Sequence, residues 1–123
     1  MSESLVQALI VDDDQSWSCE LASFLAEEGF AVHVAHNVQD AFNICRTHRP
    51  DYLLLDVLLL HENGLDLVDR MHEAGIFSAQ VVVITGGADL GDIVRLRRQG
   101  VEDVMFKPVA AADLIEKQVS SLR

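Results

Sequence analysis

Five short apolar runs alternate with amphipathic stretches along the chain, and this alternation limits the possible folds more than any other feature. The runs cover residues 6–11, 31–35, 52–56, 81–85 and 103–106. Three of them are almost wholly apolar, as expected for parallel strands that are covered on both faces. His33 interrupts the second run, which suits a strand at the edge of a sheet. We therefore expect five strands, with residues 31–35 at an edge.

The segments between these runs have the period of amphipathic helices. Apolar side chains share one helical face in three of them: Trp17, Leu21, Phe24 and Leu25; Val38, Ala41, Phe42 and Cys45; and Ala111, Leu114, Ile115 and Leu122. Residues suited to helix ends agree with this spacing, namely Asn37 and Asp89 as N-caps, Gly29, Gly75 and Gly100 at C-termini, and Pro50 after the second helix. The pattern is (βα)5. It predicts a flavodoxin-like, doubly wound parallel sheet of five strands in the order 2-1-3-4-5, within one domain over residues 1–123.

Composition narrows the possible partners. The chain has 123 residues, half of them hydrophobic, and a formal net charge of -11. A phosphate backbone or an anionic membrane surface would repel such a chain, so we expect neither direct nucleic-acid binding nor membrane association. No apolar stretch approaches the roughly 20 residues of a membrane span. Cys19 and Cys45 form no CxxC pair and are predicted to be buried free thiols, which together indicate a cytoplasmic protein.

Polar residues gather where the predicted strands end. Ligands of open parallel sheets bind beyond the carboxyl ends of the strands. Those ends carry Asp12, Asp13 and Asp14, then Asp56, then Thr85 with Gly86, and finally Lys107 with Pro108. If the first and third strands are neighbours, the carboxylates lie close together, and either their pKa values rise or a cation binds. Mg²⁺, or Mn²⁺ in its place, suits such oxygen ligands.

This set of groups favours phosphoryl transfer onto Asp56. An ionised aspartate is a nucleophile without the help of a general base, so the other groups need only position and neutralise the transferred phosphoryl group. The metal ion, the Lys107 ammonium and the Thr85 hydroxyl could share its three oxygens. Each residue alone has a plain structural explanation as a cap or turn residue. Their joint position at one edge of one sheet favours the functional interpretation.

Four motifs resemble a response-regulator receiver domain of two-component signalling. They are "LIVDDD", "YLLLDVLLLHENG", "VVVITG" and "DVMFKPV", and together they cover essentially the whole chain. The resemblance implies a phosphoacceptor domain that takes a phosphoryl group from a sensor histidine kinase or a histidine phosphotransfer protein and then switches conformation. Such a domain is a signalling switch and not a turnover enzyme.

The resemblance also implies a role for individual residues. Asp56 is similar to the phosphoacceptor, Thr85 to the switch hydroxyl and Lys107 to the lysine that binds the phosphoryl group, with Pro108 commonly following through a cis peptide. The implied Mg²⁺ ligands are Asp12, Asp13, Asp56 and the backbone carbonyl of Leu58, with Asp13 the more direct of the acidic pair.

Several positions depart from the family pattern. Leu60 stands where proline is usual, Asn63 where aspartate is frequent, and Val109 where phenylalanine is common. Val104 occupies the position of the usual switch aromatic, and we expect Phe106 to face differently from it. The phosphorylation chemistry is thus expected to be intact while the read-out is altered.

Residues near the phosphoacceptor also bear on the lifetime of the phosphoryl group. Leu58 and Gly87 are similar in position to the residues that, in this family, gate the hydrolytic water, and neither side chain can orient water through a hydrogen bond. We therefore hypothesise slow hydrolysis of the aspartyl phosphate. Leu59 and Leu60 are expected to pack beneath the loop, with a docking patch as the alternative.

The fourth helix carries Arg95, Arg97 and Arg98 on an otherwise acidic chain. A solvated helix face is the simpler interpretation. The alternative is a homodimer or partner surface formed by the fourth and fifth helices, where these arginines would meet acidic residues such as Asp113 and Glu116.

Three other functions compete with the phosphoacceptor. A phosphatase with an aspartyl-phosphate intermediate would want a second Asp at position 58, where Leu stands. A flavodoxin-like cofactor carrier would want a Ser/Thr/Gly-rich phosphate loop in place of "DDDQS". A phosphorylation-independent pseudo-receiver, which acts as a protein–protein interaction module, stays open.

Overall fold

A parallel sheet forms the centre of the protein. The computed structural model describes residues 5–87, 89–101 and 103–107, to which the structural statements below refer. Its sheet strands are β1 (Gln7–Val11), β2 (Ala31–Ala35), β3 (Tyr52–Leu55), β6 (Gln80–Thr85) and β7 (Asp103–Phe106). All neighbours pair in parallel in the order β2-β1-β3-β6-β7. The predicted strand order is confirmed, as is the edge position of residues 31–35.

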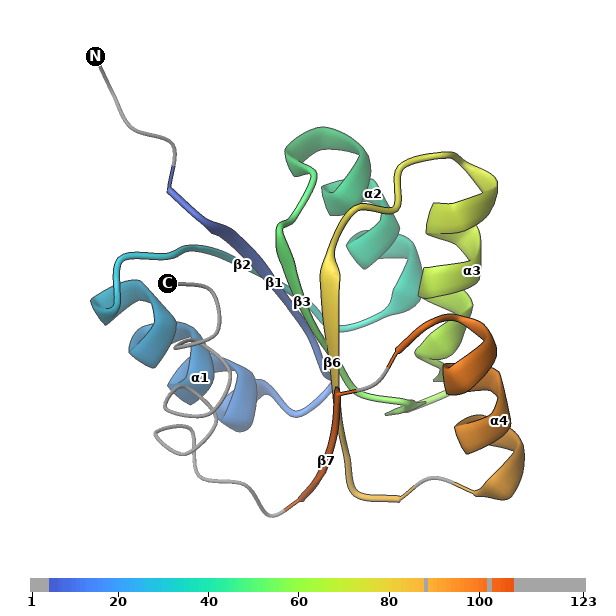
Figure 1. Ribbon diagram of the computed structural model, residues 1–123. Helices are drawn as coiled ribbons and strands as arrows, with labels where there is room; N and C mark the ends of the chain where they lie inside the picture. Colours follow the sequence, from blue (N-terminus) through green and yellow to red (C-terminus); the bar gives the residue numbers. More distant parts are fainter. Residues whose placement is uncertain (1–4, 88, 102, 108–123) are drawn as a thin grey trace.

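Helices cover both faces of this sheet. They are α1 (Gln15–Glu27), α2 (Val38–His48), α3 (Leu65–Glu73) and α4 (Leu90–Arg98). Figure 1 shows α2, α3 and α4 on one face and α1 on the other, as a doubly wound topology requires. The predicted flavodoxin-like fold is therefore confirmed. The fifth helix predicted around residues 111–122 lies outside the described residues.

Short polar side chains fix where the helices begin. The side chain of Asp14 accepts from the backbone N–H of Trp17 at 3.0 Å, and that of Asn37 from Asp40 N at 2.8 Å. The carboxylate of Asp89 accepts from Asp92 N at 2.8 Å. The N-caps predicted at Asn37 and Asp89 are confirmed, and each cap satisfies a backbone donor that the helix itself leaves unpaired.

Two apolar cores lie on the two faces of the sheet, because successive strand residues point to opposite sides. On one side Leu9, Leu53 and Val83 pack with the inward residues of α2, α3 and α4. On the other side Ile10 and Leu54 pack with the buried residues of α1. The wholly apolar strands are thus explained by burial on both faces.

The helix faces predicted from the sequence are mostly correct. Leu21 and Leu25 of α1 are fully buried, whereas Phe24 is 36% exposed. Cys45 is buried as predicted. The prediction for Cys19 is wrong, because this residue lies on the outer side of α1 and is exposed.

A small hairpin between β3 and α3 was not predicted. Its strands, β4 (Leu58–Leu59) and β5 (Glu62–Asn63), pair antiparallel, with Leu58 opposite Asn63 and Leu59 opposite Glu62. The sequence gives no hairpin signal such as Asn-Gly between two alternating runs. The hairpin directly follows Asp56 and shapes the region around it.

Polar contacts clamp α4 onto α3. The guanidinium of Arg95 contacts Asp66 at 2.7 Å and Asp69 at 2.6 Å. The amide of Gln99 donates to the carboxylate of Asp69 at 2.9 Å and to the carbonyl of Leu65 at 3.0 Å. Arg95 is therefore partly exposed and bound to α3, and not simply part of a solvated helix face. A homodimer through the fourth and fifth helices stays a prediction.

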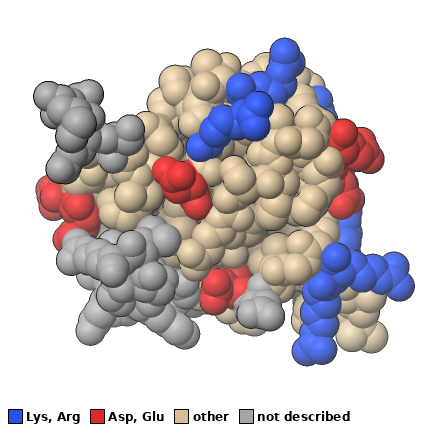
Figure 2. Space-filling view, turned by 45° about the horizontal axis from the view of Figure 1, so that its top comes forward, with Lys and Arg blue, Asp and Glu red and all other residues tan. Residues whose placement is uncertain are grey.

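Charges are spread over the surface. On the face shown in Figure 2, most Lys and Arg side chains form two separate groups with uncharged surface between them, not one continuous band. A continuous basic stripe is what tracks a phosphate backbone. Among the described residues, no helix has the length and apolarity needed to span a bilayer.

The clamp makes stability depend on pH. Hydrogen bonds from Gln99 and Arg95 lower the pKa of Asp69. A lowered pKa contributes stability that is present above the ordinary aspartate value and is lost as the pH falls through the value in the folded protein. We expect Arg95→Gln to reduce the free energy of unfolding at neutral pH by about 0.5–1 kcal/mol, because the pair is partly exposed.

Urea denaturation followed by circular dichroism would measure this difference. The difference in free energy of unfolding between Arg95→Gln and the parent chain should become smaller as the pH falls and Asp69 is protonated. Arg97→Gln is the matched control, since Arg97 lies about 200° further around α4 than Arg95. An equal loss in both variants, or a loss that does not depend on pH, would contradict the clamp.

Candidate functional site

The ends of four strands place the predicted site residues at one edge of the sheet. Backbone ladders extend to these residues: Asp12 N–H donates to Ala35 O at 3.1 Å, and Asp56 N–H donates to Val11 O at 2.9 Å. The N–H of Lys107 donates to Thr85 O at 2.8 Å. The backbones of Asp12, Asp56 and Lys107 are thus each held by the last hydrogen bond of a strand pair.

Three carboxylates meet at this edge. Asp12, Asp13 and Asp56 each offer an oxygen within 4.8 Å of the others. Asp12 is only 2% exposed and Asp56 only 5% exposed, whereas Asp13 is half-buried. Ionised carboxylates so close together and so poorly hydrated require a compensating positive charge. Oxygen donors of this kind fit a hard divalent cation such as Mg²⁺.

Lys107 supplies one positive charge. Its Nζ donates to Asp12 Oδ2 at 2.8 Å and to Asp56 Oδ2 at 3.0 Å, so that it bridges the ends of β1 and β3 from beyond β7. Burial lowers the pKa of Lys107, but the hydrogen bonds and charges of the two carboxylates outweigh this effect and raise it. The ammonium therefore stays charged in the site.

The pKa of Asp12 is raised, chiefly because burial disfavours its charged form. The hydrogen bond from Lys107 opposes this effect, and the nearby charge of Asp56 adds to it. A backbone N–H from Asp14 donates to Asp12 Oδ1 at 2.9 Å. Burial thus disfavours the charged form of Asp12, and a nearby positive charge would stabilise that form.

Asp56 is held in a fixed orientation. Its Oδ1 accepts from the backbone N–H of Leu58 at 3.0 Å, while Oδ2 accepts from Lys107. Thr85 is fully buried, and its hydroxyl donates to Gly87 O at 2.8 Å, which holds the turn that follows β6. The structure brings the side chains of Asp12, Asp13, Asp56 and Lys107 together and places Thr85 at the end of the adjacent strand.

Gly64 is a residue that the sequence analysis did not single out for the site. A Cβ at this position would overlap the carbonyl oxygen of Asp56 and would lie 3.0 Å from Cδ1 of Leu55. The N–H of Gly64 donates to Val57 O at 2.8 Å. The hairpin therefore closes directly on the backbone of Asp56, and only a residue without a side chain fits there.

Glu62 and Asn63 connect the hairpin to two helices. The carboxylate of Glu62 accepts from Val38 N at the start of α2 at 2.9 Å. The amide nitrogen of Asn63 donates to Asp92 Oδ1 in the first turn of α4 at 3.0 Å. Sequence analysis assigned no role to either contact, because each joins residues far apart in the chain.

Leu59 and Leu60 differ in their environments. Leu59 is 7% exposed and belongs to the core, as predicted, but Leu60 is 74% exposed, so the prediction that it packs beneath the loop is wrong. Leu58 is also exposed, and its Cδ1 would lie 3.6 Å from a Cβ at Gly87. Leu58 and Gly87 therefore lie next to each other beside Asp56.

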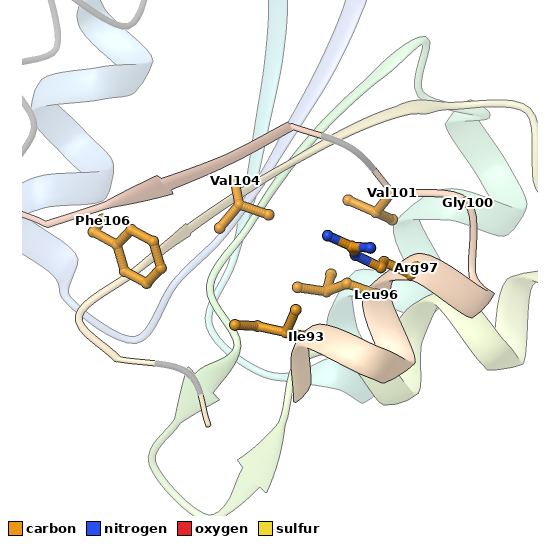
Figure 3. Close-up of a pocket in the computed structure, with 7 residues that line it drawn as sticks. All are labelled: Ile93, Leu96, Arg97, Gly100, Val101, Val104 and Phe106. Atoms are coloured by element: carbon orange, nitrogen blue, oxygen red, sulfur yellow. The ribbon is translucent and has the colours of Figure 1, made fainter. Parts of the chain in front are cut away.

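Val104 and Phe106 face the same side of β7. Figure 3 shows both side chains lining one pocket of about 520 Å³ between β7 and α4, together with Ile93, Leu96, Arg97, Gly100 and Val101. The expectation that Phe106 faces differently is wrong, because residues two apart in a strand point to the same face. Val104 packs against the core, while Phe106 is 54% exposed and pairs in register with Thr85.

The parallel five-stranded sheet with a buried acidic site at its carboxyl edge defines a flavodoxin-like α/β domain whose site suits phosphate or cation chemistry. The family model described as "Response regulator receiver domain" matches residues 8–118. The chain therefore belongs to the response-regulator receiver domain family, as its motifs predicted. Phosphorylation and Mg²⁺ binding are typical of this signalling family.

Two curated relatives support the assignment to this family. The chain is 31% identical over 121 residues to the Regulator of RpoS of Escherichia coli K12, which covers 97% of this chain and 36% of that protein. It is 31% identical to the photosynthetic apparatus regulatory protein RegA of Rhodobacter capsulatus over 86% of this chain and 57% of that protein. The chain thus spans about a third to somewhat over half of these curated relatives.

A solved structure shows the same fold. A CheY-like response regulator receiver domain protein from Methanospirillum hungatei JF-1 superposes with a TM-score of 0.87 at 28% identity, over 97% of this chain and 94% of that one. The match over nearly the whole of both chains supports the assignment to the family.

The tight closure at Gly64 gives a test of the site's architecture. We expect Gly64→Ala to lower the free energy of unfolding by about 2–3 kcal/mol, because the new methyl group would displace the Asp56 backbone or the hairpin. Urea denaturation would measure this loss. Gly86→Ala is the matched control, since a Cβ at Gly86 meets nothing within 4 Å. Similar stabilities of the two variants would contradict the assigned packing.

Proposed function

We propose that the chain is a phosphoacceptor switch that accepts a phosphoryl group on Asp56 from a phosphohistidine donor. The observation that carries this proposal is the buried Asp56 carboxylate, fixed by Lys107 Nζ at 3.0 Å and by the N–H of Leu58 at 3.0 Å, beside a cluster of acidic oxygens. These two donors hold the carboxylate in one orientation, and a carboxylate nucleophile needs no general base.

The proposed step transfers one phosphoryl group. A carboxylate oxygen of Asp56 attacks phosphorus, and the phosphorus–nitrogen bond of the phosphohistidine breaks. The electron pair of that bond stays on the ring nitrogen, and the imidazole, which already carries a proton on its other nitrogen, leaves as the neutral ring. Lys107 neutralises the negative charge on the phosphoryl oxygens. We assign Thr85 a supporting role, in which its hydroxyl leaves Gly87 O and turns to a phosphoryl oxygen.

Asp12, Asp13, Asp56 and the carbonyl of Leu58 would hold the divalent cation in this proposal. When bound, Mg²⁺ or Mn²⁺ supplies positive charge that offsets the crowded carboxylates and the incoming phosphoryl group. The close approach of the three acidic oxygens, within 4.8 Å of one another, supports this assignment.

The proposed donor is a sensor histidine kinase or a histidine phosphotransfer protein, as is typical of the family, and we propose that the reaction takes place in the cytoplasm. Phosphorylation would then shift the conformational equilibrium of the domain and control an output domain or a partner protein. Since the named relatives are longer than this chain, the identity of that output belongs to the proposal.

Intact mass spectrometry tests the acceptor. After incubation with Mg²⁺ and acetyl phosphate, we expect the parent chain to gain one phosphoryl mass and Asp56→Asn to gain none, because the substitution removes the nucleophilic oxygen pair. Asp51→Asn is the matched control, since Asp51 lies just before the other end of β3 and accepts from Gln7 N. It should gain the mass like the parent chain.

A parent chain that gains no mass with acetyl phosphate or with a phosphohistidine donor would overturn the proposal. That result would favour the pseudo-receiver, which binds partners without being phosphorylated. A gain of mass in Asp56→Asn would instead place the acceptor on another residue.

The leucine at position 58 and the glycine near it at position 87 predict a long-lived phosphoryl group, because neither side chain can orient water through a hydrogen bond. We expect Leu58→Asn to shorten the lifetime about five- to tenfold, because an amide there can orient the attacking water and a hydrogen bond near 1 kcal/mol corresponds to this factor. Loss of the phosphoryl mass with time after removal of the donor measures the rate.

Leu60→Asn is the control for that experiment, because Leu60 is an exposed leucine of the same hairpin segment. Its lifetime should match that of the parent chain. The hypothesis fails if the parent loses the phosphoryl group within seconds, or if Leu58→Asn leaves the lifetime unchanged.

A further inference from the structure

Asn63 lies at a junction between the site and α4. It is the last residue of β5, directly before Gly64, which closes on the backbone of Asp56. Its Oδ1 accepts from Leu65 N at 2.8 Å, and its amide nitrogen donates to Asp92 Oδ1 at 3.0 Å. A single side chain thus joins the hairpin, the start of α3 and the first turn of α4.

The chemistry of its two partners fixes the orientation of this amide. The N–H of Leu65 can only donate, so the amide oxygen must face it, and the Asp92 carboxylate can only accept, so the amide nitrogen must face Asp92. An aspartate at position 63 could still accept from Leu65. It would, however, point a second carboxylate at Asp92 within about 3 Å, where like charges repel.

The partner of Asn63 is part of the N-cap of α4. Asp89 and Asp92 form a capping box, in which Asp89 N–H donates to Asp92 Oδ2 at 3.2 Å and Asp92 N–H donates to Asp89 Oδ1 at 2.8 Å. Asp92 therefore divides its two oxygens between the cap and Asn63. Any displacement of Asn63 acts directly on the group that begins the helix.

The position of α4 depends on few apolar contacts. Within this helix Leu96 is the buried residue, while Leu90, Ile93 and Val94 are exposed. The polar contacts of Asp92, Arg95 and Gln99 therefore carry much of its attachment. A helix held in this way can respond to the loss or movement of one hydrogen bond.

We propose that Asn63 is a positioning residue that couples the phosphorylation state of Asp56 to α4 through its hydrogen bond to Asp92. This inference rests on the proposed function. The Leu58 N–H and the Lys107 ammonium both donate hydrogen bonds to the Asp56 carboxylate. Phosphorylation of that carboxylate changes the acceptors that are available to these two donors. The hairpin that carries Leu58 also carries Asn63 on its opposite strand, so a shift of the first residue moves the second.

Hydrogen exchange of the α4 first-turn amides, Asp92 and Ile93, tests the coupling. In the parent chain we expect phosphorylation with Mg²⁺ and acetyl phosphate to change their exchange rates about tenfold, as for the loss or gain of one charge-assisted hydrogen bond. In Asn63→Asp the change should disappear, although intact mass shows that Asp56 is phosphorylated.

A polarity swap distinguishes coupling from simple damage to the fold. In the double variant Asn63→Asp with Asp92→Asn, the new amide can donate to the carboxylate at position 63, and its oxygen can still accept from Asp89 N–H. The response of α4 should therefore return. Asn43→Asp is the matched control, because Asn43 is an exposed asparagine of α2 and the substitution adds the same charge away from this contact.

The outcomes separate the two proposals. A parent chain without the phosphoryl mass would overturn the proposed function and this inference together. The inference alone would be overturned if α4 of the phosphorylated Asn63→Asp variant responds like that of the parent. It would also be overturned if phosphorylation leaves the exchange rates of α4 unchanged in the double variant. Response in the parent, loss in Asn63→Asp and return in the double variant would support it.

Discussion

The pairing of one half-buried ammonium with two buried carboxylates is the interaction on which the rest of the structure depends. Asp12 and Asp56 end neighbouring strands and are almost inaccessible to water, and Lys107 contacts both at 2.8 and 3.0 Å. Without Lys107, two like charges would be buried side by side with no compensation, which is strongly unfavourable. The register of β1, β3 and β7 therefore has to bring these three residues to one point, and the sheet order does so.

The same crowding leaves the site with more negative charge than Lys107 can neutralise. The Lys107 ammonium contacts two of the three nearby carboxylates but carries a single positive charge, so two negative charges are left over at the edge of the sheet when all three are ionised. A divalent cation can offset that charge, and a phosphoryl group can then approach Asp56. The excess of negative charge thus follows from the three carboxylates that two strand ends and one turn bring together, and it suits the proposed divalent cation.

Much of this arrangement could be predicted from the sequence. Burial on both faces makes the strands wholly apolar, so the strands and the polar residues that end them stood out, as Asp56 does among leucines. What could not be predicted depends on contacts between residues far apart in the chain. Glu62 reaches α2 and Asn63 reaches α4 only because the hairpin folds over the sheet edge. The two-residue period of a strand places Phe106 with Val104, and the helical period places Cys19 off the face of Leu21 and Leu25, so both outcomes follow from local sequence. The exposure of Leu60 does not, because it depends on the turn of a hairpin that local sequence does not indicate.

The departure at position 63 now has a physical explanation. An aspartate there would serve the N–H of Leu65 equally well, but it would face the Asp92 carboxylate of the α4 capping box. An asparagine satisfies both, since it accepts at one end and donates at the other. Residues 63 and 92 therefore have to be considered as a pair, and the choice of amide at one follows from the carboxylate at the other. In a helix with one buried residue, such a polar pair is a substantial part of what fixes its start. The pair also links α4 to the hairpin that follows Asp56, without an aromatic side chain at position 104.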